Sequence, residues 1–162
     1  IKPEQIAIMD RGYRCLYSGV DFSGWKATSG WRSHDWQFRF HGSKDEADTS
    51  LKSEELFDDY GFIFDVRVSE ETKPLAFQLR GKDISAIQIA PDMYKGVLLL
   101  KGRNWNRFEG ELRGNQLTLT LNDKKIFDGK KIDGLPVKGP IRIVPTGPIS
   151  MANIYVRPLD KI

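Results

Sequence analysis

The amino-acid sequence predicts an all-β protein, either a two-sheet antiparallel β-sandwich or a barrel. Three observations support this prediction: apolar and polar residues alternate over many short segments, turn residues separate these segments, and few segments show helical spacing. A chain of 162 residues holds one domain of ordinary size. We therefore expect residues 1–162 to form a single β-sandwich domain, either by themselves or as part of a longer chain.

The alternation is clearest in residues 62–68, where every second side chain is apolar. The same pattern recurs in residues 75–80, 84–89 and 117–121. Further strand candidates are residues 36–40, 96–100, 107–113, 124–127, 141–145 and 149–157. The side chains that this pattern places between the sheets are Phe64, Val66, Phe77, Leu79, Ile87, Leu117, Leu119 and Leu121.

Turn and helix signals complete the prediction. Gly114-Asn115 and Asn122-Asp123 each stand between alternating segments, which is typical of β-hairpins. Five prolines interrupt the last third of the chain, which argues against helices there. Helical spacing is confined to residues 3–14 and a short segment at 53–57.

Composition excludes several classes of protein. No stretch approaches the ~20 apolar residues of a membrane span, so we expect no membrane insertion. The net charge is +3, and the lysine pairs at 124–125 and 130–131 flank a turn, which favours a solvated hairpin over a nucleic-acid site. The single cysteine, Cys15, permits no internal disulfide. The acidic loop 43–50 lacks the glycine and distal glutamate of a calcium loop, which favours a solvated loop. We expect no metal site and no cofactor.

Four groups of residues, taken in order, resemble one known family. They read LYSGVDFSGWK (16–26), LKS with YGFIFDVR (51–67), NWN with GN and LN (104–122), and GPIR with ANIYVRPL (139–159). Together they resemble the 3-keto-disaccharide hydrolase domain family, a bacterial family long described as a domain of unknown function. The resemblance covers nearly the whole chain and depends on the order and spacing of the groups.

This resemblance implies a jelly roll of the concanavalin A-like lectin and glucanase type. It also implies a glycosidase or carbohydrate-binding activity and an extracellular or periplasmic location. The family closes its first and last strands in one sheet, so we expect residues 16–22 to lie beside residues 149–157.

The chain departs from the family pattern in two neighbouring strands. In residues 75–80 only Arg80 matches, and in the next strand Gln88 and Ile89 match, with Asp92 matching after a one-residue offset. Ala86 stands where the family has a glutamate. If that carboxylate is catalytic in active members, the resemblance implies that this chain has lost it.

Polar side chains in three predicted strands indicate a binding face. If residues 62–68, 75–80 and 84–89 pair as neighbours, their polar groups converge on one side of a sheet. These groups belong to Asp65, Arg67, Gln78, Arg80 and Gln88. Their mixture of donors and acceptors suits sugar hydroxyls. The alternative is the ordinary solvated face of an antiparallel sheet.

Aromatic residues extend this predicted face. The C–H face of a sugar stacks on an aromatic ring, and Trp105 lies between two asparagines. We therefore add Trp105 and Asn106 to the predicted carbohydrate-binding residues, at the rim of the face. The other tryptophans are expected to bridge the core and the surface.

Catalysis would need further groups. Ordinary glycoside hydrolysis uses two carboxyl groups, and only Asp65 is placed on the predicted face. A 3-keto sugar can instead be cleaved by proton abstraction, for which His34 or Asp92 is the candidate base and Arg80 or a metal would hold the oxyanion. The sequence thus leaves open a hydrolase acting on an oxidised glycoside, a non-catalytic carbohydrate-binding module, and an interaction domain.

Overall fold

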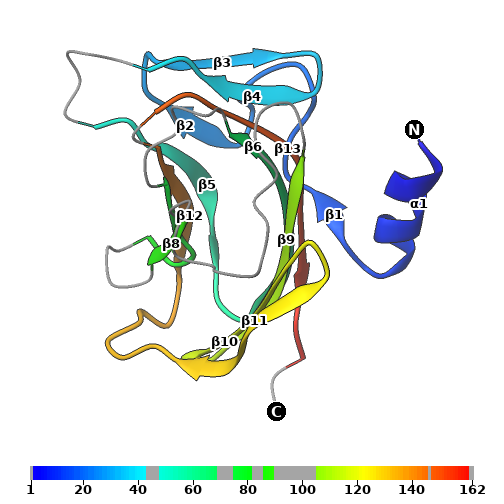
Figure 1. Ribbon diagram of the computed structural model, residues 1–162, viewed down its shortest axis with the longest axis vertical. Helices are drawn as coiled ribbons and strands as arrows, with labels where there is room; N and C mark the ends of the chain where they lie inside the picture. Colours follow the sequence, from blue (N-terminus) through cyan, green and yellow to red (C-terminus); the bar gives the residue numbers. More distant parts are fainter. Residues whose placement is uncertain are drawn as a thin grey trace.

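The computed structural model describes residues 2–42, 48–68, 75–81, 86–89, 105–145 and 147–160. Within these residues, two antiparallel sheets face each other and one short helix lies outside them (Figure 1). The elements are α1 (Pro3–Asp10), β1 (Arg14–Cys15), β2 (Trp25–Ala27), β3 (Trp31–His34), β4 (Gln37–Phe40), β5 (Leu51–Phe57), β6 (Tyr60–Val68), β7 (Leu75–Gln78), β8 (Ala86–Ile89), β9 (Asn106–Arg113), β10 (Gln116–Leu121), β11 (Lys124–Lys131), β12 (Gly139–Val144) and β13 (Ile149–Pro158). The predicted two-sheet β-sandwich is confirmed.

The two sheets differ in size. The larger has eight strands. Seven follow the order β11-β10-β9-β6-β13-β4-β3, and the eighth, β1, pairs with the C-terminal part of β13. The smaller has five strands in the order β2-β5-β12-β7-β8. In Figure 1, β3 and β4 lie across the top of the molecule and β11 near its lower edge.

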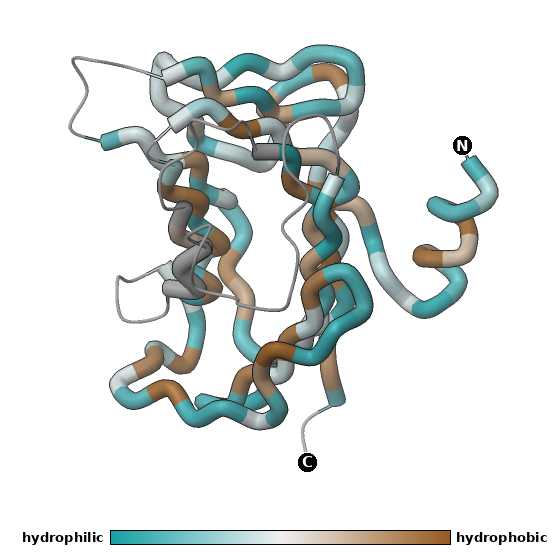
Figure 2. The backbone as a smooth tube through the Cα atoms, in the orientation of Figure 1, coloured by the Kyte–Doolittle hydropathy of each residue, from teal (hydrophilic) through white to brown (hydrophobic). Residues whose placement is uncertain are grey.

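The core lies between the sheets and is filled by alternate side chains from both. Hydropathy accordingly alternates along the strands (Figure 2). Phe64 of β6 stacks on Phe77 of β7, with ring centroids 5.6 Å apart, and thereby joins the two sheets. The predicted core positions found buried are Phe64, Val66, Phe77, Leu79, Leu117, Leu119 and Leu121. The side chain of Ile87, also predicted to be buried, lies outside the described residues.

The predicted helix at 53–57 is wrong, because these residues belong to strand β5. Ser53 pairs with Trp25 of β2, and Phe57 pairs with Gly139 of β12. Main-chain pairing on both sides of β5 overrides the weak local preference for a helix. The sequence pattern also missed β2 and β3, and the predicted strand at 96–100 lies outside the described residues.

The first helix is shorter than its pattern indicated. It ends at Asp10, and Gly12 follows with a φ of 89°, a left-handed conformation that glycine adopts without strain. The chain then enters β1, where Arg14 pairs with Val156. The N–H of Leu16 donates to the carbonyl of Ile154 at 2.8 Å. The predicted pairing with the last strand is therefore found, but at residues 14–16 rather than 16–22.

Helix α1 packs against the outer face of the eight-stranded sheet. Ile8 and Tyr13 form a small apolar cluster with Ile63 of β6 and Tyr155 of β13. The guanidinium of Arg157 lies over the Tyr13 ring, 5.0 Å from its centroid. One end of this outer face is therefore covered by the N-terminal segment.

Candidate ligand-binding face

The predicted convergence of three strands on one face is wrong, because β6 and β7 belong to different sheets. Strand β6 pairs with β9 and β13, whereas β7 pairs with β12 and β8. Asp65 and Arg67 therefore lie on the eight-stranded sheet. Gln78 lies on the five-stranded sheet, as does the backbone of Gln88, which pairs with Ala76.

Arg80 does not occupy the centre of an exposed polar face, contrary to the prediction. Its side chain is only 2% exposed and closes one end of the sandwich. The guanidinium donates to the carbonyls of Asp58, Gly114 and Pro136 and to the carboxylate of Asp59, the last at 3.0 Å. These partners give Arg80 a structural role.

Two other predicted binding residues are also buried. Asn106 faces the core rather than the rim, and its Oδ1 accepts a hydrogen bond of 3.0 Å from Asn122. Gln78 is 3% exposed and accepts from the Arg142 guanidinium at 3.0 Å. The prediction of a rim position for Asn106 is wrong because the alternation of β9 turns that residue inward.

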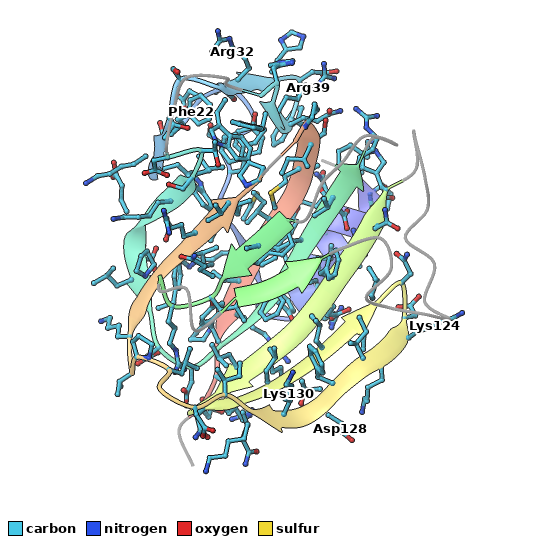
Figure 3. All side chains as sticks on the ribbon, turned by 60° about the vertical axis from the view of Figure 1, so that its left-hand side comes forward. Phe22, Arg32, Arg39, Lys124, Asp128 and Lys130 are labelled. Atoms are coloured by element: carbon cyan, nitrogen blue, oxygen red, sulfur yellow. The ribbon has the colours of Figure 1, made fainter. Side chains whose placement is uncertain are left out.

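Of the other predicted residues, Asp65, Arg67, Trp105 and His34 belong to the outer face of the eight-stranded sheet. Residues directly opposite one another in an antiparallel pair point to the same side. Arg32 pairs with Arg39, Arg39 with Ser150, and Ser150 with Arg67, so one row of side chains crosses four strands. Arg32 and Arg39 lie at the β3–β4 end of the molecule, far from Lys130 and Asp128 of β11 (Figure 3).

A second row lies beside the first. His34 pairs with Gln37 on the β3–β4 hairpin, and Asp65 pairs with Ala152 of β13. His34 is exposed and lies two residues after Arg32 in β3, so the predicted base is on this same face. The other predicted base, Asp92, lies outside the described residues.

The middle strand of this face carries short side chains. Ser150 and Ala152 project from β13 and are partly accessible. Longer side chains flank them, Arg39 on β4 and Arg67 on β6. Short residues thus stand between longer ones along β13, and we call this strip of the outer face the β13 trough.

Four side chains form a connected group at the edge of the β13 trough. The Arg67 guanidinium lies over the ring of Trp105, 4.8 Å from its centroid. Nη2 of Arg67 also donates to Oε1 of Gln37 at 3.2 Å. Nε of Arg39 donates to the same oxygen at 3.0 Å. We call Gln37, Arg39, Arg67 and Trp105 the arginine–tryptophan group.

The Asp65 carboxylate accepts hydrogen bonds within the sheet and so has a structural role. Its two carboxylate oxygens accept from Nε and Nη2 of Arg107, both at 2.8 Å. Nδ2 of Asn153 donates to the same carboxylate at 2.7 Å. The hydrogen bonds to Asp65 raise the pKa of Arg107, so this guanidinium stays charged.

A bulge in β13 directs Asn153 towards Asp65. The register with β6 shifts between Ala152 and Tyr155, and Asn153 has a φ of 51°. Bulges often re-aim a side chain, and non-glycine residues rarely adopt this left-handed conformation. The hydrogen bond from Asn153 to Asp65 therefore joins β13 to β6 next to Ala152 of the β13 trough.

Removing the Asp65 carboxylate tests this role. We expect Asp65→Ala to lower the free energy of unfolding by about 2 kcal/mol, because it leaves Arg107 and Asn153 without their charged acceptor. Urea denaturation followed by tryptophan fluorescence measures the change. Asp128→Ala is the control, since Asp128 is 77% exposed and should cost under about 0.5 kcal/mol. Equal losses in the two variants would contradict the structural role of Asp65.

The sequence pattern missed Gln37, Arg39, Arg107 and Asn153. Alternation within residues 36–40 places Gln37 and Arg39 away from the core. It does not indicate that β13 pairs with both β4 and β6 and so brings these residues near Arg67. Nothing in the sequence indicates the bulge at Asn153. Trp105 and Arg67, by contrast, were predicted and are found in contact.

Two open hollows lie away from this face. One, of about 420 Å³, lies between β1, β2 and β5, and Arg14 and Glu55 pair within its lining. The other, of about 440 Å³, contains the Arg80–Asp59 pair. In each hollow the arginine is already paired with a carboxylate, Arg14 with Glu55 and Arg80 with Asp59, so we take the β13 trough as the better candidate for a site.

Comparisons with known proteins identify the fold. No family model matches the sequence, and no curated protein matches it either, so the family resemblance described above stays a prediction. A solved structure of a candidate glycosyl hydrolase from Parabacteroides distasonis aligns with a TM-score of 0.75 at 16% identity, covering 99% of this chain and 98% of that one. The fold is a lectin-like β-sandwich.

Two further solved structures share this lectin-like sandwich. The carbohydrate-binding module CBM66 of Bacillus subtilis aligns with a TM-score of 0.65 at 12% identity, covering 89% of this chain and 99% of the module. A Bacillus subtilis protein of unknown function with a galectin-like fold aligns with a TM-score of 0.63 at 14% identity, covering 93% of this chain and 100% of that one. At these identities the likeness concerns the fold alone.

The described residues contain neither a metal-binding cluster nor a membrane-spanning helix. No group of three or more His, Cys, Asp or Glu residues among them could hold a metal ion. The helix they contain is too short to cross a membrane.

Proposed function

We propose that this protein binds a glycan in the β13 trough, with the arginine–tryptophan group as its main contact. The observation that carries this proposal is the contact between Arg67 and Trp105 beside the short residues Ser150 and Ala152. The names of two structural neighbours, a candidate glycosyl hydrolase and a carbohydrate-binding module, support a carbohydrate ligand.

The chemistry of the face suits a sugar. Guanidinium groups donate to hydroxyl oxygens, and the Gln37 amide offers both a donor and an acceptor. Trp105 is half-buried and supplies an aromatic ring at the edge of the trough. Because water already satisfies these groups in the free protein, we expect weak binding.

We propose recognition of the glycan without its hydrolysis. Glycoside hydrolysis commonly requires two carboxyl groups across the scissile bond. Asp65 is held by Arg107 and Asn153, and Ala86 replaces the carboxylate that the family resemblance would supply. A secreted or periplasmic location, where glycans are accessible, belongs to the same proposal.

Trp105→Ala tests the proposed site. We expect at least a 10-fold lower affinity for a bound oligosaccharide, because buried aromatic contacts are typical binding hot spots. Isothermal titration calorimetry against a panel of neutral and acidic oligosaccharides measures it. Phe127→Ala is the matched control: Phe127 lies on β11 under Lys130, with the ammonium 4.3 Å from the ring centroid. This control should change affinity less than about 2-fold.

Three outcomes would contradict the proposal. Unchanged affinity in Trp105→Ala would place the ligand elsewhere. Release of a reducing sugar during incubation would show that the protein cleaves glycans. A panel in which no oligosaccharide binds the parent protein would exclude glycan recognition.

A further inference from the structure

Two positive charges converge on one neutral atom in the arginine–tryptophan group. Oε1 of Gln37 accepts from Nε of Arg39 at 3.0 Å and from Nη2 of Arg67 at 3.2 Å. Both arginines flank Ser150, on opposite sides of β13. Guanidinium groups bind ionised acceptors about twice as strongly as neutral ones. An amide oxygen is therefore a weak partner for two guanidinium groups.

The carboxylates on β6 and β9 of the eight-stranded sheet pair with other arginines. Asp65 is held by Arg107, Glu109 pairs with Arg11, and Glu111 pairs with Arg157 at 2.9 Å. In the part of the chain that the structure describes, neither Arg39 nor Arg67 forms an ion pair with a carboxylate.

The neighbouring residues add to this positive charge. Arg32 stands directly opposite Arg39, an arrangement of like charges that disfavours pairing of the two strands. The Arg32 guanidinium donates to the carbonyls of Ser29 and Trp31 and so brings no negative charge to the row. The row of side chains that contains Arg32, Arg39 and Arg67 therefore carries three positive charges.

We infer that the bound glycan is acidic, and that its carboxylate or sulfate group displaces Gln37 Oε1 from between Arg39 and Arg67. This inference rests on the proposed glycan binding and names the class of sugar. A carboxylate or sulfate has several ionised oxygens and can accept from both guanidinium groups at once. The Arg67 guanidinium lies over the Trp105 ring. Because guanidinium N–H groups point outward in the plane of the group, a ring against its face does not compete with an anion for them.

Gln37→Glu provides the sharpest test. The new carboxylate would pair with both arginines and occupy the place of the ligand's anionic group. We expect at least a 10-fold loss of affinity for an acidic oligosaccharide, with no fall in the melting temperature. Measuring both quantities separates occlusion of the site from unfolding.

Arginine variants distinguish a defined site from general positive charge. Arg39→Ala and Arg67→Ala should each weaken binding of the acidic ligand about 10-fold, because each removes one charged donor. Arg32→Ala removes the same charge from the same row, but its guanidinium donates to main-chain carbonyls. It should change affinity less than about 3-fold.

The ligand panel separates the sources of the anionic group. Oligogalacturonate supplies carboxylates, a carrageenan oligosaccharide supplies sulfates, and malto- and cello-oligosaccharides are neutral. Polyglutamate supplies carboxylates without sugar. We expect one acidic sugar to bind at least 10-fold more tightly than the neutral sugars and polyglutamate, with an affinity that falls as salt rises.

The possible failures are distinct. If neutral sugars bind as tightly as acidic ones, or Gln37→Glu binds the acidic sugar as well as the parent does, the inference is wrong while glycan binding stands. If polyglutamate binds as tightly as the acidic sugar, the face is a general polyanion surface and the inference is again wrong. If no sugar binds, the proposed function fails and the inference fails with it.

Discussion

Replacing Arg80 with alanine should lower the free energy of unfolding by about 3–5 kcal/mol, the range for removing one partner of a buried charged network. The Arg80 guanidinium makes five hydrogen bonds, to Asp58, Asp59, Gly114 and Pro136, which join three separate loops. Its removal would leave the carbonyl groups without this donor, and the Asp59 carboxylate would lose its charged donor while keeping the N–H of Gly114. Denaturant unfolding followed by tryptophan fluorescence measures the loss.

Arg113→Ala is the matched control for this prediction. Arg113 lies on the neighbouring β9–β10 hairpin with a side chain 41% exposed, so its removal should cost under about 1 kcal/mol. Arg80→Lys should recover only part of the stability, since an ammonium cannot reproduce the planar fork of donors. A loss under about 1 kcal/mol for Arg80→Ala would show that the loops hold together without it. Retained glycan binding in folded Arg80→Ala protein would agree with a structural role.

Phe77→Ala should destabilise the protein by a similar amount, about 3–5 kcal/mol. Phe77 is 1% exposed and contacts Phe64 and Phe108 of the opposite sheet, with ring centroids 5.6 and 5.7 Å away. Truncation removes buried apolar surface and leaves a cavity, since the two sheets relax only partly. The melting temperature and the urea midpoint should both fall.

A control on the same sheet checks this assignment of faces. Leu56 of β5 is 52% exposed, so Leu56→Ala should cost under about 1 kcal/mol. If Leu56→Ala cost as much as Phe77→Ala, burial would not explain the loss. A small effect of Phe77→Ala would mean that the core side of β7 is assigned wrongly, because a shift of one residue exchanges the two faces of a strand.

Predictions of which side chains face the core were correct where they depended on one strand alone. The alternation in residues 62–68 correctly turned Phe64 and Val66 towards the core and Asp65 and Arg67 away from it. This succeeds because successive side chains of a strand point to opposite sides, whichever strands lie beside it. The prediction for Arg67 followed this rule, whereas Trp105 was chosen for its aromatic ring and its flanking asparagines.

Prediction failed where the answer depended on which strands pair. Strands β6 and β7 follow one another in the chain but lie in different sheets, so Asp65 and Gln78 cannot share an outer face. Alternation carries no information about the partner of a strand, because every strand of a sandwich shows the same inward apolar pattern. Adjacent position along the chain was therefore a poor guide to adjacent position in space.

Local residue patterns were enough to predict an all-β sandwich with a core of alternating apolar residues, with Arg67 and Trp105 outside that core. The pairing of β4, β13 and β6, which brings Arg39, Gln37 and Arg67 together, became visible in the folded chain alone. This difference follows from the range of the interactions. The periodicity of a strand is a local property of a few residues, whereas strand pairing depends on hydrogen bonds and packing between segments far apart in the chain.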